Sequence, residues 1–192
     1  MAEKIIETFY PTSREAWREW LLKNHSSSQS VWLLGYKKNA NMPTISWEES
    51  VEEALCFGWI DSIRKSLGDG KFIQFFSKRK PNGTWSKINK EKIIKLIETG
   101  HMTDAGLATI EKAKQKGSWT ILDEVEALII PADLEDAFLR NPNSKEFYLS
   151  LSKSNQKAIL QWIVLAKLPE TRLKRINEIA ERASQSLKPK HL

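Results

Sequence analysis

Hydrophobic positions near the start of the chain recur every three or four residues, which is the spacing of one face of an α-helix. Trp17 and Trp20 lie on this face, after a short polar segment whose hydroxyl groups favour a helix start. The helix is expected to end near Asn24, where a serine-rich loop begins. Further along, Ser46 has Glu49 three residues later, a capping-box pattern that predicts a second helix.

Three apolar segments are short and rich in β-branched and aromatic residues, which favours strands over helices. Residues Val31–Lys38 read as one buried strand. Residues Trp59–Lys65 and Lys71–Ser77 read as two further strands, joined by the turn residues Gly68–Gly70. The expected sheet is therefore small and antiparallel.

Helical patterns return after this hairpin. Asn89 is predicted to cap a helix over Lys90–Thr99, and a second helix is expected from Thr103 to Gly117. Beyond Trp119 the strand signals end, and the expected elements are all helices: Asp133–Leu139, Ser144–Leu151, Ser154–Ala166 and Pro169 to about Ala183. The pattern predicts an α+β domain over residues 1–120, followed by an all-helical unit over residues 121–192.

Composition narrows the class of protein. The chain has 192 residues, 41% of them hydrophobic, and no apolar run long enough to form a membrane-spanning helix. A single cysteine, Cys56, excludes an internal disulfide and a cysteine-based zinc site. The first residues lack the basic and apolar regions of a signal peptide. We therefore expect a cytoplasmic protein.

The net charge of +6 is unevenly distributed. Residues 71–120 carry a net +7 and residues 151–192 a net +6, whereas residues 121–150 carry −5. The acidic block either neutralises a basic block within the fold, or leaves two basic blocks to attract an anion. Nucleic acid is thus one possible partner, alongside an anionic small molecule or protein.

The strongest candidate binding segment follows the third predicted strand. Lys78, Arg79 and Lys80 are three cations between a strand end and a turn, and Trp85 supplies a flat apolar ring close by. Such a ring beside an arginine can stack a base or another planar group. The alternative is a solvated basic turn in which Trp85 packs against the protein.

The start of the following helix adds donors to this segment. Ser86, Lys87 and Asn89 lie where a helix presents unpaired N–H groups and a partial positive charge, an arrangement that suits phosphate or carboxylate. The alternative is that Ser86 or Asn89 only caps the helix.

A second candidate lies on the preceding strand. Trp59 and Asp61 are two residues apart, so their side chains are expected on the same face. A pairing of Asp61 with Arg79 would place a charged pair in a pocket. The alternative is that Trp59 belongs to the core and Asp61 pairs with Arg64 or caps a turn.

Signals for catalysis and for metal binding are weak. The acidic ridge Glu48, Glu49, Glu52 and Glu53 suggests an iron site as an alternative function, although acids in a first helical turn also offset the helix dipole. Cys56 has only His25, His101 and His191 as possible partners, at no recognised spacing. No phosphate-binding or nucleophile motif is present. No catalytic residue, metal site or cofactor is predicted, and we do not expect an enzyme.

Several motifs resemble the YdeI/OmpD-associated family, in the order in which that family has them. They are Glu53–Ser62, Phe76–Lys80, Trp85–Asn89, Gly100–Gly106, Ala113–Trp119 and Thr171–Ile176. The resemblance implies a bacterial protein with a frataxin-like (YjbR/CyaY-like) α+β fold and a helical OmdA-type C-terminal domain. It also implies a link to protection against bacteriocins or cationic antimicrobial peptides. The leading hypothesis is a non-enzymatic binding protein for an anionic ligand or partner. The alternatives are nucleic-acid binding, iron handling, and a small-molecule enzyme with a pocket lined by Trp59, Asp61 and Trp85.

Overall fold

The computed structural model describes residues 7–190 and residue 192. The first six residues, on which the expectation about a signal peptide rests, and His191 lie outside the described residues. The chain divides into two compact units, Met1–Trp119 (unit 1) and Thr120–Leu192 (unit 2). In the described chain, none of the helices is both long enough and apolar enough to cross a membrane.

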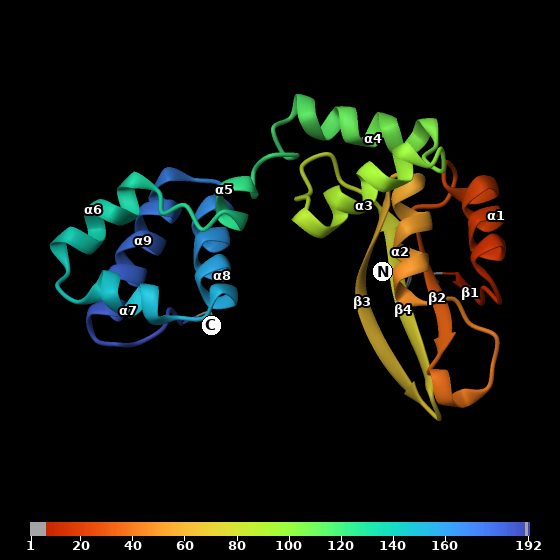
Figure 1. Ribbon diagram of the computed structural model, residues 1–192, viewed down its shortest axis with the longest axis horizontal. Helices are drawn as coiled ribbons and strands as arrows, with labels where there is room; N and C mark the ends of the chain where they lie inside the picture. Colours follow the sequence, from red (N-terminus) through yellow and green to blue (C-terminus); the bar gives the residue numbers. More distant parts are fainter. Residues whose placement is uncertain (1–6, 191) are drawn as a thin grey trace, which may run out of the picture. The chain divides into compact units, whose positions relative to one another are not determined.

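Unit 1 is an α+β structure with a mixed, four-stranded sheet in the order β1-β2-β4-β3 (Figure 1). Its strands are β1 (Thr8–Phe9), β2 (Ser30–Tyr36), β3 (Trp59–Gly68) and β4 (Lys71–Lys78). Its helices are α1 (Arg14–Asn24), α2 (Trp47–Cys56), α3 (Lys87–Glu98) and α4 (Asp104–Gln115), with the short 3-10 helix η1 (Lys38–Ala40) after β2.

The three longer strands pair antiparallel, as expected, but β1 pairs parallel to β2. The expectation of an antiparallel sheet is therefore wrong at this edge. The reason is that β1 has only two residues, too few to show an alternating pattern in the sequence. The frataxin-like assignment stays a prediction.

Short polar motifs start the helices of unit 1, because each satisfies N–H groups that have no partner within the helix. Ser13 caps α1 and Thr103 caps α4. Ser46 and Glu49 form the reciprocal capping box of α2. The helix α3 differs from the prediction: Ser86 caps it, three residues before Asn89, and its hydroxyl accepts a hydrogen bond from the Asn89 N–H.

The core of unit 1 lies between the sheet and helices α1 and α2. Alternate residues of the strands face it, as Val31, Leu33 and Phe76 do, and the tryptophans Trp17 and Trp59 are fully buried there. The remaining helices, α3 and α4, lie at the end of the sheet where β4 ends and β3 begins (Figure 1). That end of the sheet is where the predicted basic segment emerges.

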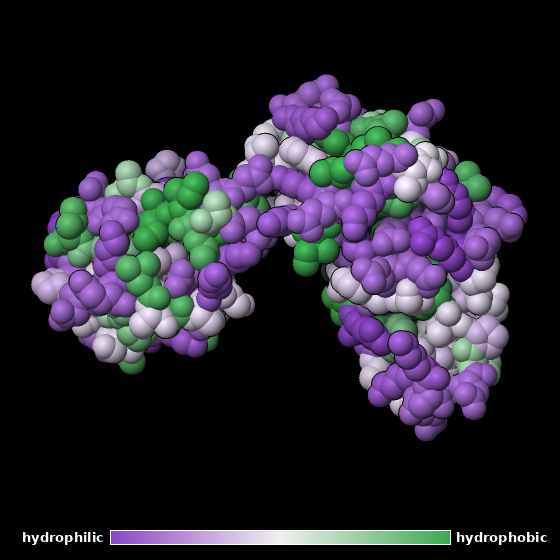
Figure 2. All heavy atoms as spheres, viewed as in Figure 1, coloured by the Kyte–Doolittle hydropathy of each residue, from purple (hydrophilic) through white to green (hydrophobic). Residues whose placement is uncertain are grey.

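Unit 2 is all-helical and has a hydrophobic core of its own. Its helices are α5 (Asp123–Glu126), α6 (Ala132–Arg140), α7 (Ser144–Ser150), α8 (Lys153–Val164) and α9 (Pro169–Ser184). The apolar stripe of α9 packs into this core through Ile176 and Ile179, next to Ile163 of α8. The basic α9 therefore uses its apolar side to hold unit 2 together. Hydrophobic side chains also remain scattered over the unit's surface (Figure 2).

Candidate functional site

A pocket of about 310 Å³ lies in unit 1 between α4 and the adjoining ends of β3 and β4. Basic side chains dominate its polar lining: His25 after α1, Lys78 and Arg79 at the end of β4, and Lys112 on α4. We call it the cationic pocket. Its other lining residues are Phe57, Gly58, Trp59, Pro81, Ala105, Ala108 and Thr109.

The backbone at the base of the pocket requires a glycine. Gly58 follows α2 with a φ of +72°, a conformation that other residues rarely adopt, and its carbonyl accepts a hydrogen bond from the Arg79 N–H at 2.9 Å. A Cβ atom at position 58 would lie 2.2 Å from Oγ1 of Thr109. The missing side chain thus lets α4 approach the strands closely enough to form the pocket wall.

Arg79 is the most unusual group in this wall. Its guanidinium lies 3.6 Å from the ring centre of Trp85, and its Nη1 donates to the Thr84 carbonyl at 3.0 Å. Its Nε is buried and has no hydrogen-bond partner in the described chain. Burial lowers the pKa of Arg79 to about 10, and the charge of Asp61 offsets this only in part. A cation is therefore held here against a desolvation cost.

The neighbouring basic groups are oriented by backbone oxygens. Lys78 Nζ donates to the Ser26 carbonyl at 2.7 Å, and His25 Nδ1 lies 2.9 Å from the Leu21 carbonyl. Because a carbonyl only accepts hydrogen bonds, this contact requires a hydrogen on Nδ1 of His25. The second ring nitrogen, Nε2, is then the one that can contact a ligand. Neither Lys78 nor Arg79 has a carboxylate within ion-pair distance among residues 7–190 and 192. The arrangement suits a small anion.

The structure brings together three of the nine predicted site residues: Trp59, Lys78 and Arg79 line the cationic pocket. Lys80 and Lys87 are exposed outside it, and Lys87 lies 3.9 Å from Glu91. Ser86 caps α3 through the backbone of Asn89. His25 and Lys112 were missed, because they reach the pocket only through tertiary packing and no local sequence signal marks them.

The expectation that Trp85 offers an open ring for stacking a ligand is wrong. Its side chain is 2% exposed and belongs to the hydrophobic core. The guanidinium of Arg79 covers it, and the ring of Trp119 lies 5.1 Å away. Trp85 therefore supports Arg79 from the protein side, and Arg79 lines the cationic pocket whereas Trp85 does not.

The pairing of Asp61 with Arg79, one of the two alternatives for this strand, is not found, whereas the alternative that Trp59 belongs to the core is confirmed. Oδ2 of Asp61 accepts hydrogen bonds from Nε1 of Trp47 at 2.9 Å and from Nε2 of Gln74 at 3.2 Å. It pairs with neither Arg79 nor Arg64 in the described structure. Trp59 is fully buried, with one side at the base of the pocket.

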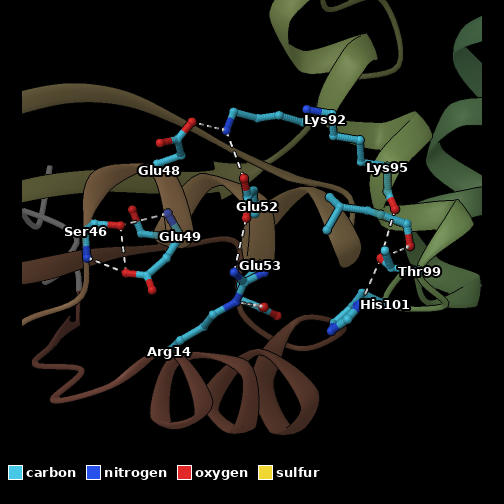
Figure 3. Close-up of polar contacts among 12 residues, drawn as sticks. Arg14, Ser46, Glu48, Glu49, Glu52, Glu53, Lys92, Lys95, Thr99 and His101 are labelled. Carbon is cyan, nitrogen blue, oxygen red and sulfur yellow. Dashed lines mark hydrogen bonds and ion pairs between the residues drawn. The ribbon is translucent and has the colours of Figure 1, made fainter.

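The acidic ridge of α2 is occupied by the protein's own cations (Figure 3). Lys92 bridges Glu48 and Glu52, each at 2.9 Å, and the hydrogen bond from Lys92 lowers the pKa of Glu48. Arg14 lies 3.1 Å from Glu52 and 2.6 Å from the buried Glu53. Among the described residues there is no group of histidine, cysteine and acidic side chains that fits a metal ion. The geometry gives the iron alternative no support.

The thiol of Cys56 is buried at the end of α2. Burial and the charge of Glu53 raise its pKa to about 11. A thiol that stays protonated at neutral pH is a poor nucleophile, so the environment is that of a packed core residue.

Comparison with protein families assigns the two units to different models. Residues 9–109, within unit 1, match the family described as a domain of unknown function (DUF8412). Residues 127–186, within unit 2, match the model described as "Bacteriocin-protection, YdeI or OmpD-Associated". The predicted resemblance to this second family is thus shown for the C-terminal part. No curated protein and no solved structure matches the chain. Because the first match spans more than half of the sequence, the chain belongs to the family of the domain of unknown function DUF8412.

Proposed function

We propose that unit 1 is a non-enzymatic binding module that holds a small anionic ligand in the cationic pocket. The observation that carries this proposal is the guanidinium of Arg79. It is largely buried, its Nε has no partner in the described chain, and no carboxylate of that part of the chain lies within ion-pair distance, so that only the more distant charge of Asp61 acts on it. Buried charges in proteins are normally paired, so an unpaired one in a pocket wall points to a counter-ion from outside the chain.

The rest of the pocket fits the same ligand. Lys78 and Lys112 add two cations, and His25 adds a ring nitrogen. A volume of about 310 Å³ is at the lower end of the range for small-molecule sites. The ligand class is therefore a phosphate or carboxylate compound of modest size, in which the anionic group meets Arg79.

Unit 2 supports a cellular role for this binding activity. Its match to the bacteriocin-protection model favours a role in protection against bacteriocins or cationic antimicrobial peptides. In this proposal the protein acts in the cytoplasm and unit 1 senses an anionic compound. Deleting the gene is expected to increase sensitivity to such peptides, and the unchanged gene should restore resistance. Equal sensitivity of the two strains would contradict the role in protection.

Binding is tested with inorganic phosphate as the probe. The thermal midpoint of the full chain is measured while phosphate replaces chloride at constant ionic strength. A ligand that binds only the folded state raises the midpoint, so the unchanged protein is expected to show a rise that saturates. Arg79→Met should abolish the rise, because it removes the unpaired cation and keeps a long apolar side chain over Trp85.

Arg140→Met is the matched control. Arg140 is exposed on α6 in unit 2, so this variant removes the same charge from a unit that contributes no residue to the pocket lining. It should respond to phosphate as the unchanged protein does. If Arg79→Met also responds fully, or if the unchanged protein shows no rise, the proposal is wrong.

A further inference from the structure

The sheet of unit 1 has a second face, whose apolar residues do not belong to the hydrophobic core. Trp32 on β2 lies opposite Phe75 on β4, and next to this pair Leu34 lies opposite Ile73. All four side chains are partly exposed, whereas the residues that alternate with them face helices α1 and α2. We call these four residues the aromatic face.

Two aromatic rings occupy the middle of this face. β2 and β4 are the central strands of the sheet, and the rings of Trp32 and Phe75 meet edge to face with centres 4.9 Å apart. On the neighbouring edge strand β3, Ile63 and Leu67 are also exposed, by 58% and 54%. The two central strands therefore present an apolar, partly exposed surface.

Positive charge borders the rings. Lys65 on β3 is paired in register with Ile73, and its Nζ lies 5.1 Å from the ring centre of Trp32. Lys71 begins β4 opposite Tyr36. Both lysines are exposed, and neither forms an ion pair within the described chain. Hydrophilic side chains continue around the far end of the β3–β4 hairpin (Figure 2).

Strands β2, β3 and β4 place no carboxylate on this face, and Asp69, in the turn between β3 and β4, is the acidic residue nearest to Lys71 in the sequence. Asp61 is the only acidic residue of strands β2, β3 and β4, and its carboxylate is turned to the opposite face, where Trp47 and Gln74 bind it. The aromatic face therefore combines stacking surface with uncompensated cations. A second copy of the chain fits poorly, because two such faces would bring lysines against lysines.

We propose that the aromatic face binds single-stranded nucleic acid. Bases stack on partly exposed rings regardless of sequence, and phosphates are attracted by lysines beside them. A four-stranded sheet with aromatic side chains on its central strands is a geometry that presents such rings to unpaired bases. In this assignment Trp32 and Phe75 stack the bases, and Lys65 and Lys71 contact the backbone. The site is separate from the cationic pocket and goes beyond the ligand proposed there.

The test uses the full chain and a fluorescent single-stranded oligothymidylate of about 12 nucleotides, a length within the range that one small domain covers. Anisotropy at about 50 mM salt gives the dissociation constant, and a salt series gives the number of phosphates neutralised. Phe75→Leu keeps an apolar side chain in the sheet and removes the ring. It should weaken binding about tenfold, the loss expected for one stacked base.

The double variant Lys65→Gln/Lys71→Gln separates charge from stacking and does not alter the packed rings. It should weaken binding and reduce the log–log salt slope by about 1.4, since each phosphate contact to a single strand contributes about 0.7. Lys23→Gln/Lys116→Gln, on α1 and after α4, is the matched control, because it removes the same charge from exposed positions that are not on the aromatic face. The control should lose far less affinity.

Three results would overturn the proposal. The first is no binding of the oligonucleotide by the unchanged protein. The second is equal affinity of the Lys65/Lys71 variant and its control, which would mean that any binding is elsewhere. The third is concentration-dependent dimerisation, or binding to anionic vesicles, that Phe75→Leu abolishes while oligonucleotide binding persists. Circular dichroism shows whether each variant is folded. If Phe75→Leu does not fold, the Lys65/Lys71 variant and its control still test the proposal.

Discussion

Unit 1 contains two arginine environments with opposite electrostatics. Arg14 and Arg18 both reach Glu53, at 2.6 and 2.7 Å, and this carboxylate is 1% exposed. Burial alone would lower the pKa of Arg14 and Arg18, but the hydrogen bonds and charge of Glu53 raise it above the ordinary value. Arg79 is buried against Trp85 with no such partner in the described chain, and its pKa falls to about 10.

The two environments differ in what the charged groups contact. Arg14 and Arg18 form ion pairs within the fold, whereas Arg79 forms none in the described chain and can contact a ligand. Around Glu53 each of the three charged groups has an ion-pair partner: Arg14 and Arg18 share Glu53, and Arg14 also pairs with Glu52. This network connects α1 to α2 (Figure 3). Around Arg79 the protein bears a desolvation cost that the charge of Asp61 offsets only in part, and we infer that an external anion supplies the rest. The same residue type therefore serves stability in one place and ligand binding in the other.

The largest expected effect comes from breaking the compensated trio. Glu53→Gln keeps the shape of the side chain and removes its charge, which leaves two arginines facing a neutral amide. Removing one partner of a buried pair costs about 3–5 kcal/mol, and because both arginines are about 30% exposed to water we expect about 2–3 kcal/mol here. Urea unfolding of the full chain measures the loss.

Glu111→Gln is the control for this prediction. Glu111 pairs with Lys114 at 2.8 Å on the same unit, but both side chains are at least half exposed. Exposed pairs contribute little, so the free energy of unfolding should change by less than about 0.5 kcal/mol. If the two glutamate variants lose the same free energy of unfolding, the ion pairs of Glu53 contribute no more than an exposed pair and the prediction is wrong.

A smaller effect of opposite sign is expected at Arg79. Arg79→Met removes an uncompensated charge together with one hydrogen bond, so we expect a free energy of unfolding between unchanged and about 1 kcal/mol higher at neutral pH without phosphate. A loss of more than about 1 kcal/mol would mean that Arg79 is a structural group, like Arg14.

The pH dependence sharpens this test. The folded-state pKa of Arg79, about 10, is lower than its ordinary value of 12.5. Between these values the unfolded chain holds a proton that the folded chain has released, so this group makes stability rise with pH. Arg79→Met lacks that contribution. The advantage of the variant over the unchanged protein should therefore shrink as pH rises above 10, in unfolding curves recorded at each pH.

Local patterns were sufficient for most of the fold. The caps at Ser13, Ser46 and Thr103 and the hairpin turn before Lys71 are set by neighbours within a few residues, and the structure has all of them. α3 was predicted to begin too late because Ser86 and Asn89 are both good caps, and only the backbone geometry decides between them.

The site was predictable only in part, because its geometry depends on distant partners. The basic run at Lys78 and Arg79 was visible, but the burial of Trp85 depends on Trp119, more than thirty residues later. Likewise, Glu53 looked like part of a solvated acidic ridge until α1 placed two arginines over it. Sequence patterns show which charges exist, whereas tertiary packing decides which of them are compensated.

The smallest expected effect concerns the other buried polar atom without a partner in the described chain, the hydroxyl of Tyr148 in unit 2. Tyr148 is 1% exposed within the core of that unit, its ring 5.4 Å from that of Phe138. Unlike Arg79 it is uncharged and packed among apolar groups, so nothing about it points to a ligand. Tyr148→Phe should raise the free energy of unfolding by about 0.5–1 kcal/mol, the cost of burying an unpaired hydroxyl.

Tyr148 also titrates with the opposite sign to Arg79. Burial raises its pKa from 10 to about 12, so between these values the folded protein keeps a proton that the unfolded chain has lost. Stability from this group therefore falls as pH rises from 10 to 12, and Tyr148→Phe should lack that fall. Tyr10→Phe is the control, because the Tyr10 hydroxyl donates to the Pro43 carbonyl and its removal should destabilise. If Tyr148→Phe is less stable than the unchanged protein, the Tyr148 hydroxyl has a hydrogen-bond partner. Tyr148 would then no longer share with Arg79 the feature of a buried polar atom without a partner.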